Sequence, residues 1–275
     1  MLFSTFYFSG TGNTKWVVEQ FNDIIVNNGH KSEIYTIDIN EILSKEQLLN
    51  ILNNSDFIGF ANPIYGADIP PIMKKFINHV LHLHKSAKIT AKPLYIINTF
   101  GYINAFGPFA AKRLFVNTGF IFTAYVNIRI CNNVSTPKLK VNLINSDKLN
   151  RRKEETKKEL LTLVKSLIRK KKYITGIGPY LILGIVIRNK VRMSIKNHYK
   201  SLSINADTCN KCLLCINNCP CKSIITIDNE IKFSNDCTAC MRCYNFCPTS
   251  SILVDGKFAD PIIYQRYRGP NTVIK

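Results

Sequence analysis

The chain has 275 residues, long enough for a domain with its own core and a second module. A hydrophobic content of 46% and a mean hydropathy of -0.01 exclude a disordered chain and an integral membrane protein. The net charge of +19 is unevenly placed: residues 148–200 carry 16 Lys and Arg against 3 Asp and Glu. A charge so localised argues against an evenly basic nucleic-acid-binding surface, and we expect no nucleic-acid partner.

Strand and helix patterns alternate along residues 1–147. Helices are predicted at Lys15–Asn27, Ser44–Leu52, Ile72–Leu83 and Pro108–Asn117. The strand-like runs are apolar on both faces, as in a parallel sheet covered by helices: Leu2–Phe8, Glu33–Ile39, Asp56–Ala61, Leu94–Thr99 and Phe120–Ile130. We therefore expect a five-stranded, doubly wound α/β domain. Ligands of such sheets bind beyond the carboxyl ends of the strands, which here are the turns after Phe8, Ala61 and Thr99.

Residues 148–200 are interpreted as a basic helix followed by an interdomain linker. The pattern from Asp147 to about Lys172 is helical, and Gly176–Pro179 interrupts it. An apolar run over 177–187 follows, too short to span a bilayer, and then a basic stretch. Residues 201–258 form a predicted cysteine-rich module, and 259–275 a C-terminal tail.

The turn Ser9-Gly10-Thr11-Gly12-Asn13-Thr14 follows the first strand and precedes the first helix. Its spacing fits neither the Walker A loop nor the dinucleotide fingerprint, whose third glycine is replaced by Lys15. Three hydroxyls, an amide, two glycines and a helix N-terminus suit a bound phosphate monoester held by neutral donors. The alternative is a plain strand–helix junction in which Asn13 and Thr14 are caps.

This turn resembles the FMN-phosphate loop of flavodoxins, with Ser9, Thr11, Gly12 and Thr14 as the matching residues. The resemblance extends over the five-strand alternation and implies FMN as a cofactor. It also implies that the isoalloxazine lies between two later loops, at 62–70 and 98–107, which supply aromatic side chains and glycine backbone. The residues expected to flank the ring are Pro63, Tyr65, Gly66, Thr99, Phe100, Gly101 and Tyr102. A flavodoxin-like domain without its flavin is the alternative.

Eight of the ten cysteines form two runs, Cys209–Pro220 and Cys237–Pro248, each with the spacing C-x₂-C-x₂-C-x₃-C-P. This spacing is typical of bacterial ferredoxins with two [4Fe-4S] clusters, in which the fourth cysteine ligates the other cluster. The predicted ligands are Cys209, Cys212, Cys215 and Cys247 for cluster one, and Cys237, Cys240, Cys243 and Cys219 for cluster two. Zinc knuckles would leave four cysteines unused. Cys131 and Cys221 are expected to be structural.

Three interpretations of the basic segment remain open: a solvated helix face with a linker, a docking surface for an acidic redox partner protein, or association with a membrane surface. The sequence has no basic leader with a small-residue cleavage site, and its cysteines are spaced for metal rather than for disulfides. Both features predict a cytoplasmic protein.

The whole chain resembles flavodoxin–ferredoxin fusion proteins of anaerobes, including the Arg- and Tyr-rich ending after Asp260. That resemblance implies an electron-transfer protein relaying electrons between FMN and two [4Fe-4S] clusters. Two alternatives stay open: a cluster-only carrier whose flavodoxin-like domain is empty and binds protein, and a flavin-dependent reductase of a small substrate. No catalytic triad or carboxylate pair is predicted.

Overall fold

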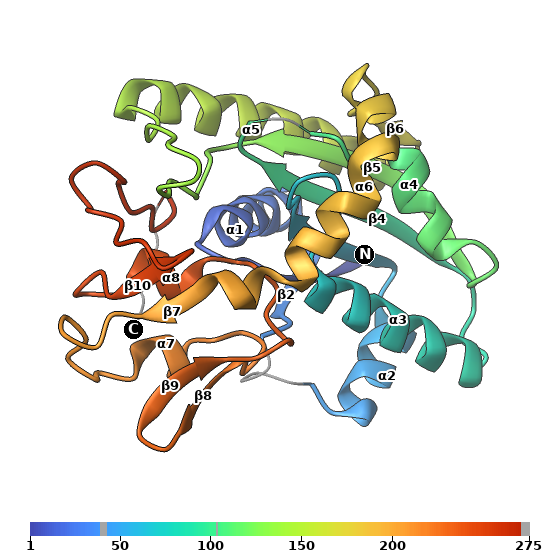
Figure 1. Cartoon of the computed structure of the whole chain (residues 1–275). Coiled ribbons are helices and arrows are strands. Elements are labelled where there is room, and N and C mark those ends of the chain that lie inside the picture. Colours follow the sequence, from blue (N-terminus) through green and yellow to red (C-terminus); the bar gives the residue numbers. More distant parts are fainter. Residues whose placement is uncertain (39–42, 103, 271–275) are drawn as a thin grey trace.

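In the computed structural model, which describes residues 1–38, 43–102 and 104–270, the first two thirds of the chain build a parallel sheet covered on both faces. The sheet has six strands in the order β2-β1-β3-β4-β5-β6, all parallel (Figure 1). They are β1 (Leu2–Tyr7), β2 (Lys31–Thr36), β3 (Phe57–Pro63), β4 (Lys92–Phe100), β5 (Phe120–Arg129) and β6 (Tyr173–Ile174). The first five follow the flavodoxin-like order 2-1-3-4-5, which is the fold predicted.

The sixth strand corrects the prediction of five. β6 pairs with β5 through Ala124 and Tyr173, and it comes from the segment interpreted as a linker. Two residues of strand carry too little apolar periodicity to be recognised in sequence. The predicted end of the second strand at Ile39, residue Ile103 of the second flavin loop and tail residues 271–275 lie outside the described residues.

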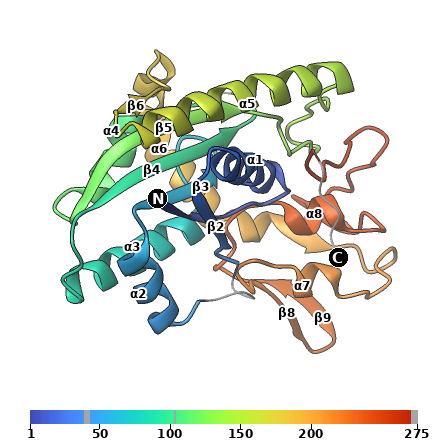
Figure 2. The same ribbon diagram turned by 180° about the vertical axis from the view of Figure 1, so that it is seen from behind.

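Helices cover the two faces of the sheet unequally. α1 and α5 lie on one face, which is in front in Figure 2, whereas α2, α3 and α4 lie on the other. Their bounds are α1 (Asn13–Asn27), α2 (Lys45–Asn54), α3 (Pro71–Ser86), α4 (Pro108–Lys112) with the 3-10 turn η2 (Arg113–Phe115), and α5 (Ser146–Ile168). The predicted basic helix is therefore real, but its apolar side belongs to the core, because Leu160, Leu163, Val164 and Leu167 are fully buried.

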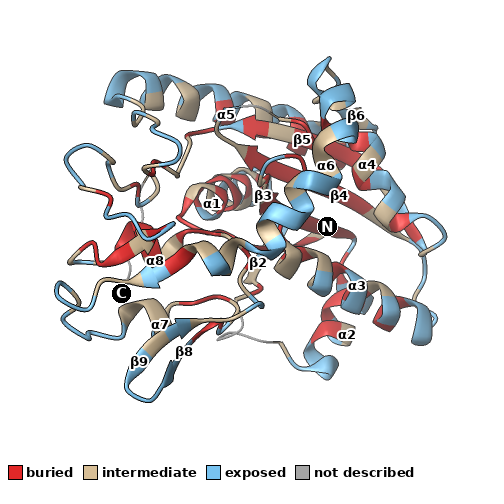
Figure 3. Ribbon diagram, viewed as in Figure 1, coloured by how far each residue is buried: buried red, intermediate tan, exposed pale blue. Residues whose placement is uncertain are grey.

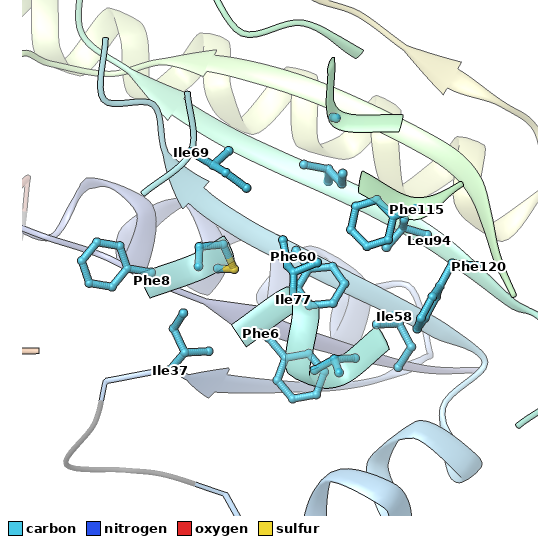
Figure 4. Packing of buried hydrophobic residues seen from close by; sticks show 14 of the residues in the cluster. Phe6, Phe8, Ile37, Ile58, Phe60, Ile69, Ile77, Leu94, Phe115 and Phe120 are labelled. Atoms are coloured by element: carbon cyan, nitrogen blue, oxygen red, sulfur yellow. The ribbon is translucent and has the colours of Figure 1, made fainter. Parts of the chain in front are cut away.

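The core on the α2–α4 face is rich in aromatic rings (Figure 4). Phe6 and Phe60 from neighbouring strands have ring centroids 5.9 Å apart, and Phe60 also packs against Phe115 at 5.6 Å. Strand residues buried on both faces explain the continuous apolar runs of the sequence. This packing fixes the carboxyl ends of β1, β3 and β4 relative to one another.

The last third of the chain forms a small region with two antiparallel strand pairs, β7–β10 and β8–β9. A helix, α6 (Tyr180–Lys196), and the 3-10 turn η3 (His198–Ser201) lead into it (Figure 1). Its elements are β7 (Leu202–Ile204), α7 (Leu214–Asn217), β8 (Ile224–Ile227), β9 (Glu230–Phe233), α8 (Arg242–Phe246) and β10 (Ile252–Val254). No helix in the described part of the chain is long and apolar enough to cross a membrane.

Candidate cofactor sites

The turns at the carboxyl ends of β1, β3 and β4 line one cavity of about 50 Å³. The first turn lines it with five of its six residues, the loop after β3 with Pro63 and Tyr65, and the loop after β4 with Thr99, Phe100 and Gly101. A further wall comes from residues 131–133, which follow β5 and were not predicted. Most of the residues expected from the flavodoxin resemblance therefore surround one space at the ligand-binding edge of the sheet.

Helix α1 points an uncapped N-terminus at this cavity. It begins at Asn13 after Gly12, whose φ of 109° lies in the left-handed region that glycine tolerates. No side chain caps α1 and its first turn has no acidic residue, as in α3, α4 and α6, whereas Ser44 caps α2 and Asn145 caps α5. The side chains of Asn13 and Thr14 therefore do not cap α1, and the N–H groups of its first turn suit an anion.

The hydroxyls of the turn are buried and held in place by the protein. Thr11 Oγ1 accepts a hydrogen bond from Asn133 Nδ2 at 3.0 Å, and Ser9 Oγ accepts one from Gly12 N–H at 3.1 Å. Thr14 Oγ1 and Thr99 Oγ1 lie 2.8 Å apart. An accepting hydroxyl keeps its own proton to donate, so Thr11 and Ser9 are fixed in position and still able to bind an oxyanion, whereas one hydroxyl of the Thr14–Thr99 pair donates to the other.

The residues expected around the ring divide into two sets. Tyr65 carries a buried hydroxyl with no hydrogen-bond partner, and burial raises the pKa of this phenol well above its ordinary value. Phe100 is half-buried beside it. Gly66 and Tyr102 do not line the first cavity: a Cβ on Gly66 would come within 2.5 Å of Val191 in α6, and Tyr102, 66% exposed, lines the larger cavity that adjoins the first.

A second cavity of about 350 Å³ adjoins the first and shares Gly101, Cys131 and Asn132 with it. Its lining includes the cations Arg129, Lys148 and Arg152 and no acidic residue. Burial and the neighbouring charge of Arg129 lower the pKa of Arg152. Sequence reasoning missed this basic wall, because Arg129 ends a strand while Lys148 and Arg152 lie on α5.

A flavin would fit this edge of the sheet in two respects. The first cavity is the size of a phosphate group, and its donors are neutral and preorganised. Together the adjoining cavities reach the volume of a small cofactor site. Tyr65 offers a ring and an unpaired buried hydroxyl at the junction with the cysteine-rich region.

The structure arranges the cysteines as two groups, each drawing on both cysteine runs. Cys219, Cys237, Cys240 and Cys243 line one small cavity of about 20 Å³. Cys215 lies close enough to Cys209 and Cys247 for their charges to interact. Cys212 is exposed. Each group contains the fourth cysteine of the other run, which is the crossing that the spacing predicts, although the charges of Cys215 and Cys243 also interact across the groups.

The pKa values of the cysteine thiols differ widely. Burial raises the pKa of Cys215 to about 11 and that of Cys240 to about 12. A hydrogen bond from Cys221, followed by those of Ser223, lowers the pKa of Cys219 to about 5. Cys221, expected from sequence to be structural, lines the same cavity. Buried thiols become thiolates once a metal replaces their protons, which suits an iron–sulfur centre.

The two cysteine runs repeat each other in backbone conformation. Lys211 and Leu213 in the first run have positive φ, as do Ala239 and Met241 at the matching positions of the second. Ser223 donates its N–H to Cys219 Sγ at 3.3 Å, and Ser251 donates to Cys247 Sγ at 3.2 Å. Amide donors to sulfur are among the groups that tune iron–sulfur clusters.

Within the described residues, no three His, Cys, Asp or Glu side chains converge on a single metal position. The cysteines of a cubane bind separate iron atoms, so each group can be spread around a cluster.

Arg242 joins the cysteine-rich region to the first turn. Its guanidinium donates to the carbonyl oxygens of Ser9 at 2.6 Å and Gly10 at 2.9 Å, and it forms an ion pair with Asp38 at 2.7 Å. A Cβ on Gly10 would lie 3.0 Å from the carbonyl oxygen of Cys240, so the two segments are in contact. The predicted phosphate loop and the cysteine group that contains Cys240 are thus direct neighbours.

Solved structures of other proteins are similar in fold to about 60% of this chain. No family model matches the sequence, and no curated protein is similar to it. Similar solved structures include a flavodoxin from the domain Archaea, with 14% identity, TM-score 0.39 and coverage of 60% of this chain and 99% of that one. The flavodiiron protein from Giardia intestinalis has 16% identity and TM-score 0.40, with 62% and 36% covered.

The rubredoxin oxygen:oxidoreductase from the anaerobe Desulfovibrio gigas has 14% identity and TM-score 0.43 over 62% of this chain. The chain spans only 36% of the length of that protein. At these identities the strand order, rather than the similarity itself, carries the assignment: a flavodoxin-like parallel α/β sheet followed by a small region with short antiparallel strands.

Proposed function

We propose that the protein transfers electrons between an FMN bound at the first cavity and two [4Fe-4S] clusters bound by the cysteine groups. The observation that carries this proposal is the contact between Gly10 of the first turn and Cys240, which belongs to the group formed with Cys219, Cys237 and Cys243. Contact between a flavin phosphate loop and a cluster ligand supports direct electron transfer between the two cofactors, without a mobile carrier.

Each part of the chain has a role in this proposal. The N–H groups at the start of α1, with Ser9, Thr11 and Thr14, hold the phosphate, and Tyr65 and Phe100 flank the ring. The cluster ligands are Cys209, Cys212, Cys215 and Cys247 for cluster one, and Cys219, Cys237, Cys240 and Cys243 for cluster two. When bound, FMN supplies one- and two-electron chemistry, and each cluster passes one electron.

Cofactor content tests the proposal. Protein purified anaerobically and reconstituted with iron, sulfide and FMN should hold about eight irons, about eight sulfides and about one FMN per chain. Iron and sulfide without FMN would instead support the cluster-only carrier with an empty flavodoxin-like domain. Absence of both cofactors would reject the proposal.

The variant Thr11→Glu separates the two cofactors. A carboxylate in this buried position repels the phosphate, so FMN content should fall while iron stays at about eight. Thr162→Glu, on the exposed side of α5, is the matched control and should keep both cofactors. FMN bound equally well by both variants would rule out this turn as the phosphate site.

The basic second cavity favours a second candidate, a flavin-dependent reductase of a small anionic substrate. Arg129 and Arg152 line the second cavity of about 350 Å³, which the flavin and a small anionic substrate would share. Substrate-dependent reoxidation of the anaerobically reduced protein would support this candidate, and its loss in Arg152→Gln would connect it to the cavity.

A further inference from the structure

Helix α6 and the turn before it expose an unusual number of large apolar side chains. The outermost are 71% exposed for Ile182, 71% for Ile185 and 74% for Val186. Figure 3 shows most of α6 as exposed or half-exposed. The set comprises Ile177, Tyr180, Ile182, Leu183, Ile185, Val186 and Met193. We call these residues the α6 apolar face.

The opposite side of α6 is anchored to the protein. A Cβ on Gly184 would lie 1.9 Å from the carbonyl oxygen of Ala105, so the helix backbone lies directly on that loop. Arg188 donates to the carbonyl oxygen of Ala67 at 3.1 Å, and Arg192 forms an ion pair with the buried Asp68. Because these contacts fix the inner side of the helix, the α6 apolar face points toward the solvent.

The most exposed apolar residues of α6 lie on one side of the helix. Ile182 and Val186 stand at i and i+4, and Met193 stands at i+11 on the same side, with the exposed Asn189 between them. By the same period, the exposed Lys190 and Lys196 fall on either side of these residues. An apolar line with cations at its margins is the pattern of a helix that lies in a membrane interface.

The chain segment that contains α6 carries charge of a single sign, and Asp68, which pairs with Arg192, comes from the loop after β3. Residues 160–206 contain no Asp or Glu. The same stretch contains ten basic residues: Lys165, Arg169, Lys170, Lys171, Lys172, Arg188, Lys190, Arg192, Lys196 and Lys200. A symmetric contact between two copies through α6 would bring like charges together, which disfavours a second copy as the occupant. Anionic lipid headgroups complement this charge.

We propose that the protein binds reversibly to the surface of an anionic membrane through the α6 apolar face. The apolar side chains enter the boundary between headgroups and acyl chains, and the surrounding lysines contact lipid phosphates and carboxylates. The helix lies on the bilayer without crossing it. Phe109 of α4, 69% exposed, extends the apolar surface, because Gly107 in the preceding turn packs against Leu181.

Co-sedimentation of the full-length holoprotein with vesicles tests this proposal. Binding is expected to phosphatidylcholine vesicles containing about 30% phosphatidylserine and to be weak for phosphatidylcholine alone. The double variant Ile182→Asp with Val186→Asp should bind the anionic vesicles with an affinity at least about tenfold lower than that of the parent. Ile262→Asp, which replaces an 86% exposed isoleucine outside α6, is the matched control and should bind like the parent.

Iron and FMN contents of the variants keep this test separate from the proposed function. Neither variant changes a proposed cofactor residue, so both should load like the parent. Equal binding by the double variant and the parent, or no binding to anionic vesicles, overturns the proposal. A dimer seen by light scattering and abolished in the double variant would assign the face to a second copy. Binding to an acidic redox protein, without binding to vesicles, would assign it to that partner. Either result overturns the membrane-binding proposal.

Discussion

At the scale of single residues, Arg242 decides how the two parts of the molecule meet. Burial lowers its pKa, but the charges of Asp38 and Cys240 outweigh this and the net pKa is raised. Its side chain is 15% exposed, and it also donates to the carbonyl oxygen of Asn218 at 3.0 Å. One guanidinium thus satisfies acceptors on both sides of the junction, a geometry that lysine cannot reproduce.

Replacing Arg242 should destabilise the holoprotein. Arg242→Gln leaves Asp38 partly buried without its cation, which costs about 3 kcal/mol or more and lowers the melting temperature by about 6 °C or more. Thermal unfolding followed by circular dichroism under anaerobic conditions measures this. Lys75→Gln is the control: it breaks the exposed ion pair with Asp236 across the same junction and should change stability by less than about 1 kcal/mol.

Two neighbouring cysteines test the ligand assignment of cluster two. Cys219→Ser should lower the iron content to about four per chain, because it removes the ligand predicted to cross from the first run. Cys221→Ser, two residues away in the same cavity, should retain about eight. Iron analysis and electron paramagnetic resonance of the reduced proteins compare them. The reverse result would make Cys221 the ligand.

At the scale of elements, α6 shows how a single glycine sets a helix position. Sequence identified the apolar run over 177–187 and the basic residues after it, but not the face that they form. That face depends on which side of the helix meets the loops after β3 and β4. The close approach of Gly184 to Ala105 selects the inner side.

A methyl group at Gly184 should displace α6. In Gly184→Ala the new Cβ overlaps the carbonyl oxygen of Ala105, so the helix must move outward at a cost of about 1–3 kcal/mol. Limited trypsin digestion should then cut faster after Lys190. Gly178→Ala is the matched control, because a Cβ there meets nothing within 4 Å. Equal cleavage of the two variants would show that α6 is not held by this contact.

At the scale of the whole molecule, the segment 148–200 is part of the folded body. α5 covers α1, β6 extends the sheet and α6 covers the loops at its ligand-binding edge. The cores are also continuous across the chain: Cys240 belongs to the same buried cluster as Phe8, and Tyr267 donates to Asn13 Oδ1 at 2.5 Å.

Truncation tests where the first folded unit ends. A fragment of residues 1–147 loses the buried Leu160, Leu163, Val164 and Leu167, about 6 kcal/mol or more of apolar burial. That loss is comparable with the net stability of a domain. We expect 1–147 to lack a cooperative thermal transition and 1–178, which keeps α5 and β6, to retain one. A cooperative transition in 1–147 would place the boundary at the end of β5.

The sequence by itself determined the features that depend on neighbours along the chain. Strand and helix alternation, the glycines and hydroxyls of the first turn, and the cysteine spacing are local patterns with a direct physical meaning. They predicted the parallel α/β sheet and most of the residues that line the first cavity, but not its wall at residues 131–133. Element bounds such as those of α1 and α5 followed within a few residues.

Only the tertiary structure decided the features that depend on residues far apart in sequence. The sixth strand, the basic wall around Arg152, the contact of Gly10 with Cys240 and the outward side of α6 each join distant segments. No local pattern encodes such pairings, because they follow from how the packed elements fill space. The cysteine spacing and the residues of the first turn indicate the chemistry, and the packing of the elements brings these two segments together.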